Sequence, residues 1–493
     1  MQKADGYVIG LDMGTQGARA VAVASDGSIV ARGEAVYTPE MLRTGPNGLF
    51  EQDAEVWWRV ACIALWHIGE ELAAHRISAE AVTALSVSGT SGSFVLLDAD
   101  YRPLRPALMY SDGRASDEVK RCNTVLGDLT HELGYQFNSS FALPKLLWLQ
   151  EHEPDTWKHT CLVAHQADYI VGRLTGFWGV TDYTNVLKTG YDLLNLRYPN
   201  AFVHELGISL ERLPRVVASG TPIGPLSTDV TSDFKLSSRT LVVAGLTDGC
   251  ASQFAAGATE PGAWVTSLGT TLTVKGTSTE LVKDPQGRIY CHRHPEHGWL
   301  PGGASSTGGE ILARRFLDDN LDAYNKRATP LTPTNLLVYP LVKHGERFPF
   351  MAPDAEGFIV GAPDAEKVAR DLYYAACLEG VALVERLAYE VTTELGAKVE
   401  GSIRTVGGAT CSQLWLRIRA SICNRSFVVP KVADPAMGTA VLAAAGRLHA
   451  DIGSAARAMV HMTTEVEPNP DWVPVYEERY TQFKQELHKR SYL

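Results

Sequence analysis

Four short stretches of this sequence place acidic, hydroxyl or glycine residues directly after an apolar run, where a strand would end. They are "GLDMGTQGARA" with Asp12, "GLTDGCASQ" with Asp248, "SLGTT" with Thr270, and "TVGGATCSQ" with Gly407 and Gly408. Carboxylates can hold a divalent cation or accept a proton, and glycine lets a ligand approach the backbone closely. Together the four stretches favour chemistry on a phosphate group more strongly than any one of them alone.

The stretch around Asp12 has two interpretations. Gly14 and Gly17 can simply form a tight hairpin. Alternatively, backbone amides and the Thr15 hydroxyl cradle a phosphate while Asp12 holds Mg²⁺, a cation usually bound by one or two carboxylates plus phosphate oxygens. A G-x-x-x-x-G-K-[ST] loop is absent from the sequence, and no G-x-G-x-x-G follows the first apolar run. These absences argue against a P-loop enzyme and a Rossmann dinucleotide site.

The other three stretches also have a plain structural interpretation beside the functional one. Asp248 can cap a helix, or it can act as a general base that takes the proton of an attacking sugar hydroxyl. Thr270 and Thr271 can bind phosphate oxygens or form a turn. Gly407 and Gly408 can end a strand, or they can leave room for a flat base or ribose.

A cluster of histidines in "HRHPEHG" invites a zinc interpretation. The spacing of His292, His294 and His297 is not H-E-x-x-H, and no nearby cysteine or acidic cluster completes a tetrahedral site. We therefore expect these histidines to be exposed residues of a loop.

The bulk composition excludes several classes of partner. The chain has 493 residues, a formal net charge of −11 and 45% hydrophobic residues, so it can build more than one core and does not favour nucleic acid. The sequence contains no apolar run of membrane-spanning length and no signal-peptide pattern at its start, so we expect a cytoplasmic protein with no membrane partner. Its eight scattered cysteines predict reduced thiols. The oligomeric state stays open, with a homodimer among the options.

The four stretches with candidate functional residues require strands that fix their positions. In the sequence, β-rich and helical patterns alternate as in an α/β fold. "YVIGLD", "ARAVAVAS" and "SIVARGEAVY" predict a meander, and "VTALSVSG" predicts a buried strand. The pattern restarts near residue 241, where "WVTSLGTTLTVKG" resembles "IGLDMGTQGARAVAV" as a weak internal repeat. We predict two domains, 1–244 and 245–493.

The ordered motifs "GLDMGTQGARAVAV", "GLTDGCASQFAAGA", "SLGTT", "TVGGATCSQLW" and "PAMGTAVLAAAG" resemble those of the FGGY carbohydrate kinases, from about residue 7 to 447. The resemblance implies two α/β domains of the ribonuclease-H-like fold, as in the actin/hexokinase superfamily, facing across a cleft. The N-terminal domain would bind the sugar and the C-terminal domain the nucleotide. It also implies ATP and Mg²⁺ as the cofactors.

Carried over position by position, the resemblance implies a role for each matched residue. Asp248 would be the catalytic base, and Asp12 would serve the metal. The sugar would be contacted by Asp12, Ser91, Asp112 and Asp248. ATP would be contacted by Gly14, Thr15, Gly269, Thr270, Gly308, Gly407, Gly408 and Gln413.

The resemblance also narrows the substrate. The turn "SGTSG" lacks the Arg-Glu pair of glycerol kinases and the "GQMHG" turn of typical xylulokinases. It is most similar to a smaller xylulokinase-like subgroup that acts on D-ribulose, which also shares "TDYTNVLKTGY" and "GERFP". We therefore expect a kinase that phosphorylates a terminal hydroxyl of a ketopentose, D-ribulose or D-xylulose. A kinase for a pentitol, glycerol or gluconate, an actin-like ATPase and a non-catalytic sugar sensor are the alternatives.

Overall fold

The computed structural model describes residues 6–317 and 320–493, and the chain divides into two compact units. The first unit runs to Thr259 and also contains His292–Gly298 and Asp434–His461. The second contains Glu260–Cys291, Trp299–Ala433 and Met462–Leu493. The expected boundary at residue 244 differs from this division. It falls inside the strand Leu241–Thr247, whereas the first unit continues to Thr259. In the described residues, no helix has both the length and the apolar composition that crossing a bilayer requires.

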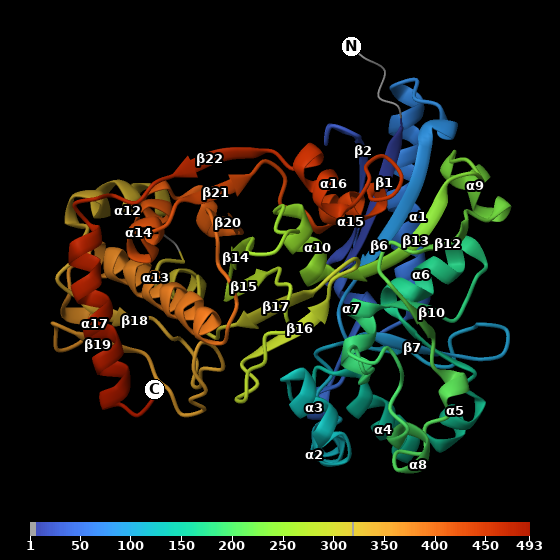
Figure 1. Ribbon diagram of the computed structural model, residues 1–493, viewed down its shortest axis with the longest axis horizontal. Helices are drawn as coiled ribbons and strands as arrows, with labels where there is room; N and C mark the ends of the chain where they lie inside the picture. Colours follow the sequence, from blue (N-terminus) through green and yellow to red (C-terminus); the bar gives the residue numbers. More distant parts are fainter. Residues whose placement is uncertain (1–5, 318–319) are drawn as a thin grey trace. The chain divides into compact units, whose positions relative to one another are not determined.

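The first unit is built on two larger sheets with helices around them (Figure 1). Its strands are β1 (Tyr7–Gly14), β2 (Gly17–Ala24), β3 (Ile29–Val36), β4 (Leu42–Thr44), β5 (Phe50–Gln52), β6 (Val82–Gly89), β7 (Phe94–Leu97), β8 (Ala107–Leu108), β9 (Leu162–His165), β10 (Val180–Asp182), β11 (Arg215–Val217), β12 (Pro222–Pro225) and β13 (Leu241–Thr247). Its helices are α1 (Ala54–Ala74), α2 (Ser116–Val125), α3 (Gly127–Leu133), α4 (Ala142–His152), α5 (Pro154–His159), α6 (Gln166–Thr175), α7 (Tyr183–Val186), α8 (Ala201–His204), α9 (Thr228–Phe234), α10 (Asp248–Ala255), α15 (Pro435–Ala444) and α16 (Ile452–Met459).

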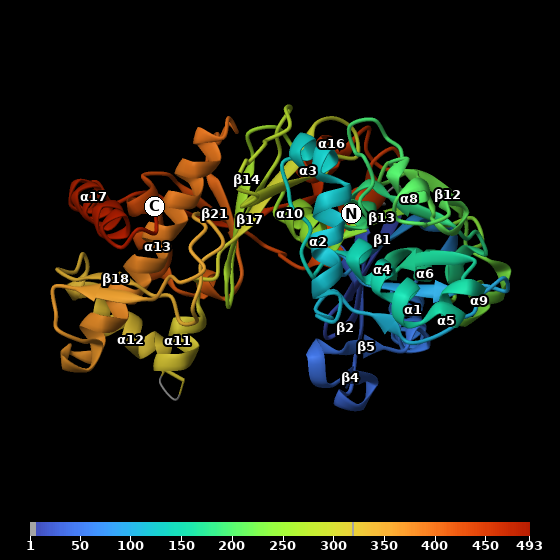
Figure 2. The ribbon, with the colours of Figure 1, turned by 90° about the horizontal axis from the view of Figure 1, so that it is seen from below.

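The second unit has one large sheet and one two-stranded sheet. Its strands are β14 (Trp264–Leu268), β15 (Leu272–Gly276), β16 (Ile289–Arg293, which continues into the first unit), β17 (Trp299–Ala304), β18 (Leu337–Tyr339), β19 (Phe358–Val360), β20 (Ile403–Val406), β21 (Phe427–Pro430) and β22 (Met462–Val466). Its helices are α11 (Glu310–Arg315), α12 (Leu321–Ala328), α13 (Arg370–Glu394), α14 (Gln413–Cys423) and α17 (Val473–Lys489). The long helix α13 lies next to β18 (Figure 2).

The main sheets of the two units share one strand plan. In the first, β1 pairs antiparallel with β2 and β2 with β3, while β6 is parallel to β1 and β13 is parallel to β6. In the second, β14, β15 and β17 pair antiparallel in the same succession, and β20 and β21 follow in parallel. The internal repeat in the sequence therefore corresponds to a repeat of the fold, and the prediction of two α/β domains is confirmed.

The two faces of β1 carry different residues because successive side chains of a strand point to opposite sides. Ile9, Leu11 and Met13 belong to the apolar core that includes α1 and α6. Gly10 lies on the other face, where a Cβ would come within 1.9 Å of the Ala436 carbonyl oxygen on α15. Asp12 follows Gly10 on the face that α15 covers.

This packing explains why the first unit needs residues from the end of the chain. Helix α15 packs against β1 and β6, and against α10 so closely that a Cβ on Gly438 would lie 1.8 Å from the Ala251 carbonyl oxygen. All side chains of α15 from Ala436 to Ala444 are buried. A boundary at residue 244 would remove both helices from the sheet that they cover.

Candidate functional site

The carboxyl ends of three parallel strands meet at one edge of the first sheet. Asp12 of β1 pairs with Ser88 of β6, and Thr247 of β13 pairs with Gly89. Asp248 follows Thr247 directly and begins α10. Two aspartates that are 236 positions apart in the sequence are thus held at the ends of the two strands that flank β6, and strand ends are the usual location of ligand sites in α/β sheets.

Asp12 is 3% exposed and is held by a short chain of hydroxyl groups. Ser88 Oγ donates to Asp12 Oδ1 at 2.7 Å, and Thr439 Oγ1 of α15 donates to Ser88 Oγ at 2.9 Å. Burial and, to a smaller extent, the negative charges of Asp248 and Asp434 together raise the pKa of Asp12 to about 7, against the lowering effects of the Ser88 hydrogen bond and of Arg19. The site therefore favours a proton or a cation on this carboxylate.

Asp248 takes the position at the start of a helix that its sequence context allowed, and it also lies near Asp12. Its Oδ1 accepts the Gly249 N–H at 2.7 Å, at the start of α10, and the residue is half-buried. The preceding Thr247 N–H donates to Thr184 Oγ1 at 2.8 Å, which fixes the end of β13. A carboxylate in this position is anchored at its helix and lies close enough to Asp12 to raise the pKa of that group.

Asp434 is a third acidic residue of this edge that sequence reasoning missed. It caps α15 by accepting the Ala436 N–H at 2.9 Å, and its charge also raises the pKa of Asp12. The signal in the sequence was an Asp-Pro step directly before "AMGTAVLAAAG". That step predicts a helix cap, and only the return of α15 to β1 brings the cap beside Asp12.

The loop 89–93 after β6 carries the predicted sugar ligand Ser91. Gln166 Oε1 accepts the Thr90 N–H at 2.8 Å and lies 2.7 Å from Thr90 Oγ1, and Thr90 Oγ1 lies 2.7 Å from Ser93 Oγ. Ser91 Oγ is buried and has no hydrogen-bond partner in the described part of the chain. A buried hydroxyl left in this state costs free energy, so a ligand oxygen is a natural partner for it.

Asp112 is fully buried, and its carboxylate is already engaged by the protein. Its Oδ2 accepts the Phe50 N–H at 2.9 Å and Arg114 Nη2 at 2.8 Å. Arg114 also lies over the ring of Trp148, 4.5 Å from its centroid. A direct contact between Asp112 and a sugar stays a prediction, and the residue's role in this structure is to hold Arg114.

Gly14 and Thr15 lie at the β1–β2 turn, at the same end of β1 as Asp12. The turn has two residues between the paired Gly14 and Gly17, and Thr15 is exposed. A Cβ on Gly14 would lie 3.4 Å from Asp12 Oδ2. The predicted tight hairpin is therefore present, and its exposed tip lies beside the acidic edge that contains Asp12.

In the second unit, four of the predicted nucleotide ligands come together around the β14–β15 turn. The turn contains Gly269 and Thr270, whose carbonyl oxygens accept the N–H groups of Gly309 at 2.9 Å and Glu310 at 3.0 Å. A Cβ on Gly308 would lie 2.5 Å from the Thr270 carbonyl oxygen, and one on Gly407 would lie 2.5 Å from the Leu268 carbonyl oxygen. Close backbone packing therefore explains the glycines at 308 and 407.

Gly408 differs from these glycines. A Cβ there would meet no atom within 4 Å, and its φ is not in the left-handed region, so the fold itself does not require glycine. Gln413 is exposed and is the first residue of α14. Open space beside the strand end of β20 suits the approach of a flat ligand.

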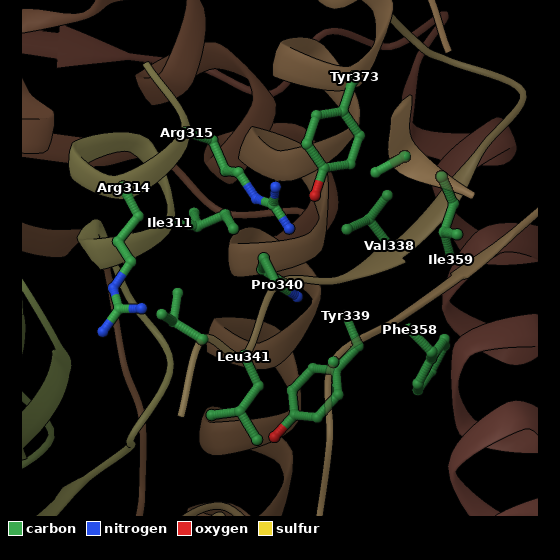
Figure 3. A pocket seen from close by; sticks show the side chains of 13 residues that line it. Ile311, Arg314, Arg315, Val338, Tyr339, Pro340, Leu341, Phe358, Ile359 and Tyr373 are labelled. Carbon is green, nitrogen blue, oxygen red and sulfur yellow. The ribbon is translucent and has the colours of Figure 1, made fainter. Parts of the chain in front are cut away.

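A cavity of the second unit lies elsewhere. About 510 Å³ in volume, it is lined by α11, β18, β19 and the start of α13, with Arg315 and Tyr373 among its side chains (Figure 3). None of the predicted ATP ligands lines it. The cavity is therefore separate from the glycine turns.

The prediction of exposed loop histidines was wrong for two of the three, because only His297 is exposed in a loop. His292 and His294 are 2% and 5% exposed, and burial lowers the pKa of His294 to about 4. His292 lies in strand β16, and His294 directly follows that strand.

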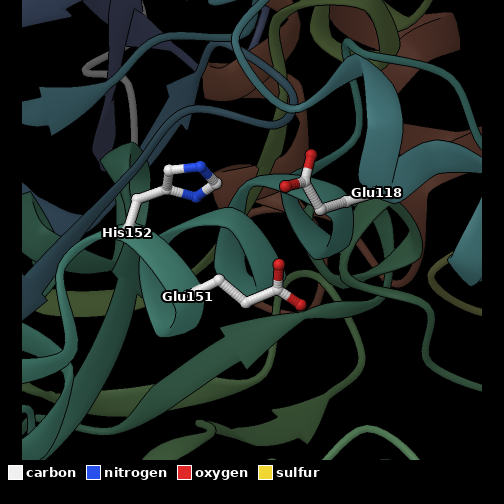
Figure 4. A group of neighbouring side chains, drawn as sticks. All are labelled: Glu118, Glu151 and His152. Atoms are coloured by element: carbon white, nitrogen blue, oxygen red, sulfur yellow. The ribbon is translucent and has the colours of Figure 1, made fainter.

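In the described residues, Glu118, Glu151 and His152 form the only group of three potential metal-binding side chains (His, Cys, Asp or Glu) whose ligand atoms lie within 4.8 Å of one another (Figure 4). Glu151 is exposed and already accepts Arg121 at 2.8 Å, so this surface group differs from the predicted Mg²⁺ site.

Two units with this strand plan, with acidic residues at the ends of the parallel strands, define the actin/hexokinase-like class of folds. The model of the FGGY family of carbohydrate kinases matches the chain with its N-terminal domain over residues 7–255 and its C-terminal domain over residues 264–447. The chain belongs to this family, and it is an ATP-dependent sugar kinase.

Individual relatives agree with this assignment. The xylulose kinase of Bacillus subtilis (strain 168) is 29% identical over 455 residues, which cover 89% of this chain and 88% of the relative. The solved xylulose kinase of Rhodospirillum rubrum has a TM-score of 0.85 at 25% identity, with 98% of each chain covered. The solved gluconate kinase of Lactobacillus acidophilus has a TM-score of 0.84 at 22% identity, again with 98% of each chain covered, and shares the fold.

Proposed function

We propose that the protein transfers the γ-phosphoryl group of ATP to a terminal hydroxyl of a ketopentose, either D-ribulose or D-xylulose. The observation that carries the proposal is the edge formed by Asp12, the Ser91 loop and Asp248 at three parallel strand ends. Similarity to xylulose kinases over most of the chain supports a ketopentose as the acceptor.

In the proposed reaction, Asp248 is the general base. Its carboxylate accepts the proton of the sugar hydroxyl as the hydroxyl oxygen forms a bond to the γ-phosphorus. The bond from this phosphorus to the bridging oxygen breaks, and ADP leaves with that oxygen. Ser91 and Asp112 belong to the proposed sugar site, and the glycine turns of the second unit, with Gln413, belong to the proposed ATP site.

The acidic edge fits a Mg²⁺ ion. Asp12 is a buried carboxylate whose pKa is raised by burial and by two neighbouring aspartates, so a divalent cation would remove an unfavourable charge arrangement. The three carboxylates do not form a compact three-ligand group, which agrees with the preference of Mg²⁺ for one or two carboxylates plus water and phosphate. Asp12 would hold the ion, which supplies charge neutralisation at the phosphate oxygens.

A coupled assay of ADP release over a panel of acceptors tests this function. The panel contains D-ribulose, D-xylulose, L-ribulose, L-xylulose, pentitols, glycerol and gluconate. We expect the highest kcat/KM with D-ribulose or D-xylulose. Activity confined to glycerol or gluconate would refute the ketopentose substrate, and ATP hydrolysis at full rate without any acceptor would refute phosphoryl transfer to a sugar.

A further inference from the structure

A buried lysine holds the loop that carries Ser91. Lys188 Nζ donates to the Ser91 carbonyl oxygen at 3.1 Å and to Ser140 Oγ at 3.4 Å, and the residue is 7% exposed. The lysine follows α7, which packs against β13. Its side chain also lies along the loop itself, because a Cβ on Gly92 would come within 3.0 Å of Lys188 Cδ.

The ammonium group of Lys188 retains one donor. It has three N–H bonds, and the Ser91 carbonyl and the Ser140 hydroxyl accept two of them. In residues 6–317 and 320–493, Nζ makes no third hydrogen bond and no ion pair, and its other contact is the face of the Phe141 ring, 5.7 Å from the ring centroid. A buried charge with an unused donor is costly unless a ligand completes its hydrogen bonds.

A second buried lysine lies close enough to Lys188 to be affected by its charge. Lys145 is completely buried, and its Nζ donates to the carbonyl oxygens of Phe141 at 3.1 Å and Tyr110 at 3.4 Å. Burial and the charge of Lys188 lower the pKa of Lys145 to about 7, against the attraction of Asp112. The charge of Lys188 therefore reaches the neighbouring lysine.

Two incomplete hydrogen-bonding groups thus meet at one residue of the proposed sugar site. Ser91 Oγ is buried without a partner, and the Ser91 carbonyl is held by an ammonium that has an N–H to spare. A ligand with oxygens on adjacent carbons can satisfy both groups at once. A ketose presents such neighbouring hydroxyl and carbonyl oxygens.

We propose that Lys188 is a sugar-binding residue that donates its remaining N–H to a sugar oxygen next to the one that Ser91 contacts. The proposal rests on the proposed function, because it needs a sugar at the Ser91 loop. It assigns Lys188 two tasks: fixing the loop through the Ser91 carbonyl and discriminating among acceptors by the position of one oxygen.

The first test compares Lys188→Met with Lys145→Met on whichever acceptor the wild-type protein phosphorylates. Lys145 is the matched control, since it is also a buried lysine and donates to two backbone carbonyls but has no bond to loop 89–93. We expect Lys188→Met to raise the KM for the sugar about 10-fold to 100-fold, as for loss of a charged hydrogen bond, with the KM for ATP changed by less than about twofold. Lys188→Arg should restore part of the loss, and Lys145→Met should lower the melting temperature with the sugar KM unchanged.

The second test varies the sugar instead of the protein. Analogues of the substrate that each lack one oxygen are compared between wild type and Lys188→Met. For the oxygen that Lys188 contacts, the wild type should lose about tenfold or more in kcat/KM, and the variant should lose almost nothing further.

Two results would overturn the proposal. One is a folded Lys188→Met protein with the wild-type sugar KM. The other is an equal rise in sugar KM in Lys145→Met, which would show a general effect of disturbing the buried lysines. Failure of the proposed function is distinguishable, because it would appear in the wild type as inactivity toward every ketopentose, and the lysine tests would then use the acceptor identified by the panel.

Discussion

At the scale of single residues, the buried carboxylate of Asp12 disfavours folding when it is charged, and the proposed Mg²⁺ site gives a reason for its presence. Its carboxylate is buried near two other aspartates and receives one hydrogen bond from Ser88. The raised pKa means that the folded protein without metal binds a proton more tightly than the unfolded chain does. Stability is therefore gained at low pH and lost as pH rises from about 4 towards the folded pKa of about 7.

Asp12→Asn should for this reason stabilise the metal-free protein at alkaline pH while impairing catalysis. Removing the charge relieves its repulsion with Asp248 and Asp434, so the melting temperature at pH 8 should rise by about 2–4 °C. At pH 5, where wild-type Asp12 is largely protonated, the gain should be small. Thermal unfolding of both proteins at the two pH values, without Mg²⁺, measures the difference. An equal shift at both values would contradict the raised pKa.

Asp248→Asn separates the structural from the catalytic role of that residue. Asparagine retains an oxygen for the Gly249 N–H, so the start of α10 and the melting temperature should be preserved. Turnover should fall by at least about a hundredfold, since an amide cannot accept the proton of the sugar hydroxyl. Steady-state kinetics with the best acceptor measure this loss, and near wild-type turnover would remove Asp248 from the role of general base.

At the scale of elements, glycines have two different explanations in the second unit. Those at 308 and 407 are required by the close packing of backbone around the β14–β15 turn. Gly408, at the end of β20, has open space where a side chain would be. The distinction separates glycines that the fold needs from one that a ligand would need.

Gly408→Val should consequently weaken ATP binding without unfolding the protein. A valine side chain would occupy space proposed for the nucleotide, and the KM for ATP should rise about tenfold or more, while the KM for the sugar stays near its wild-type value. Gly127→Val is the matched control, because a Cβ at Gly127 also meets no atom within 4 Å and the residue lies in α3 of the other unit. An unchanged KM for ATP in a folded Gly408→Val protein would refute the assignment.

At the scale of the whole molecule, the first unit is discontinuous in sequence. Helix α15, from near the end of the chain, covers the face of β1 that carries Gly10 and Asp12 and also packs on α10. Its side chains from Ala436 to Ala444 are buried, so their removal exposes a broad apolar surface. The first unit is therefore not expected to fold from its N-terminal residues alone.

Fragments test this dependence directly. We expect the fragment 1–259 to aggregate or to lack a cooperative thermal transition. The same fragment joined through a flexible Gly/Ser linker to residues 434–461 should be markedly more soluble and should show a cooperative transition by calorimetry or circular dichroism. A cooperatively folded fragment 1–259 would contradict the structural role of α15.

The sequence by itself determined the class of fold, the repeated strand plan and the chemistry-bearing turns. It could do so because strand periodicity, helix caps and glycine turns are local signals, and because the family motifs occur in order along the chain. Asp12, Asp248 and the glycine turns were proposed as site residues in this way.

Only the tertiary structure decided which of these residues meet. The return of α15 to the first unit, the position of Asp434 and the contact of Lys188 were not predicted, because each depends on a contact between distant segments. Helix α15 returns to β1, and Lys188 reaches the Ser91 carbonyl 97 positions away. Burial of the histidines at 292 and 294 was missed for the same reason. Local sequence patterns do not show which distant segments of a chain come into contact. The packing of helices on the faces of the sheets decides those contacts.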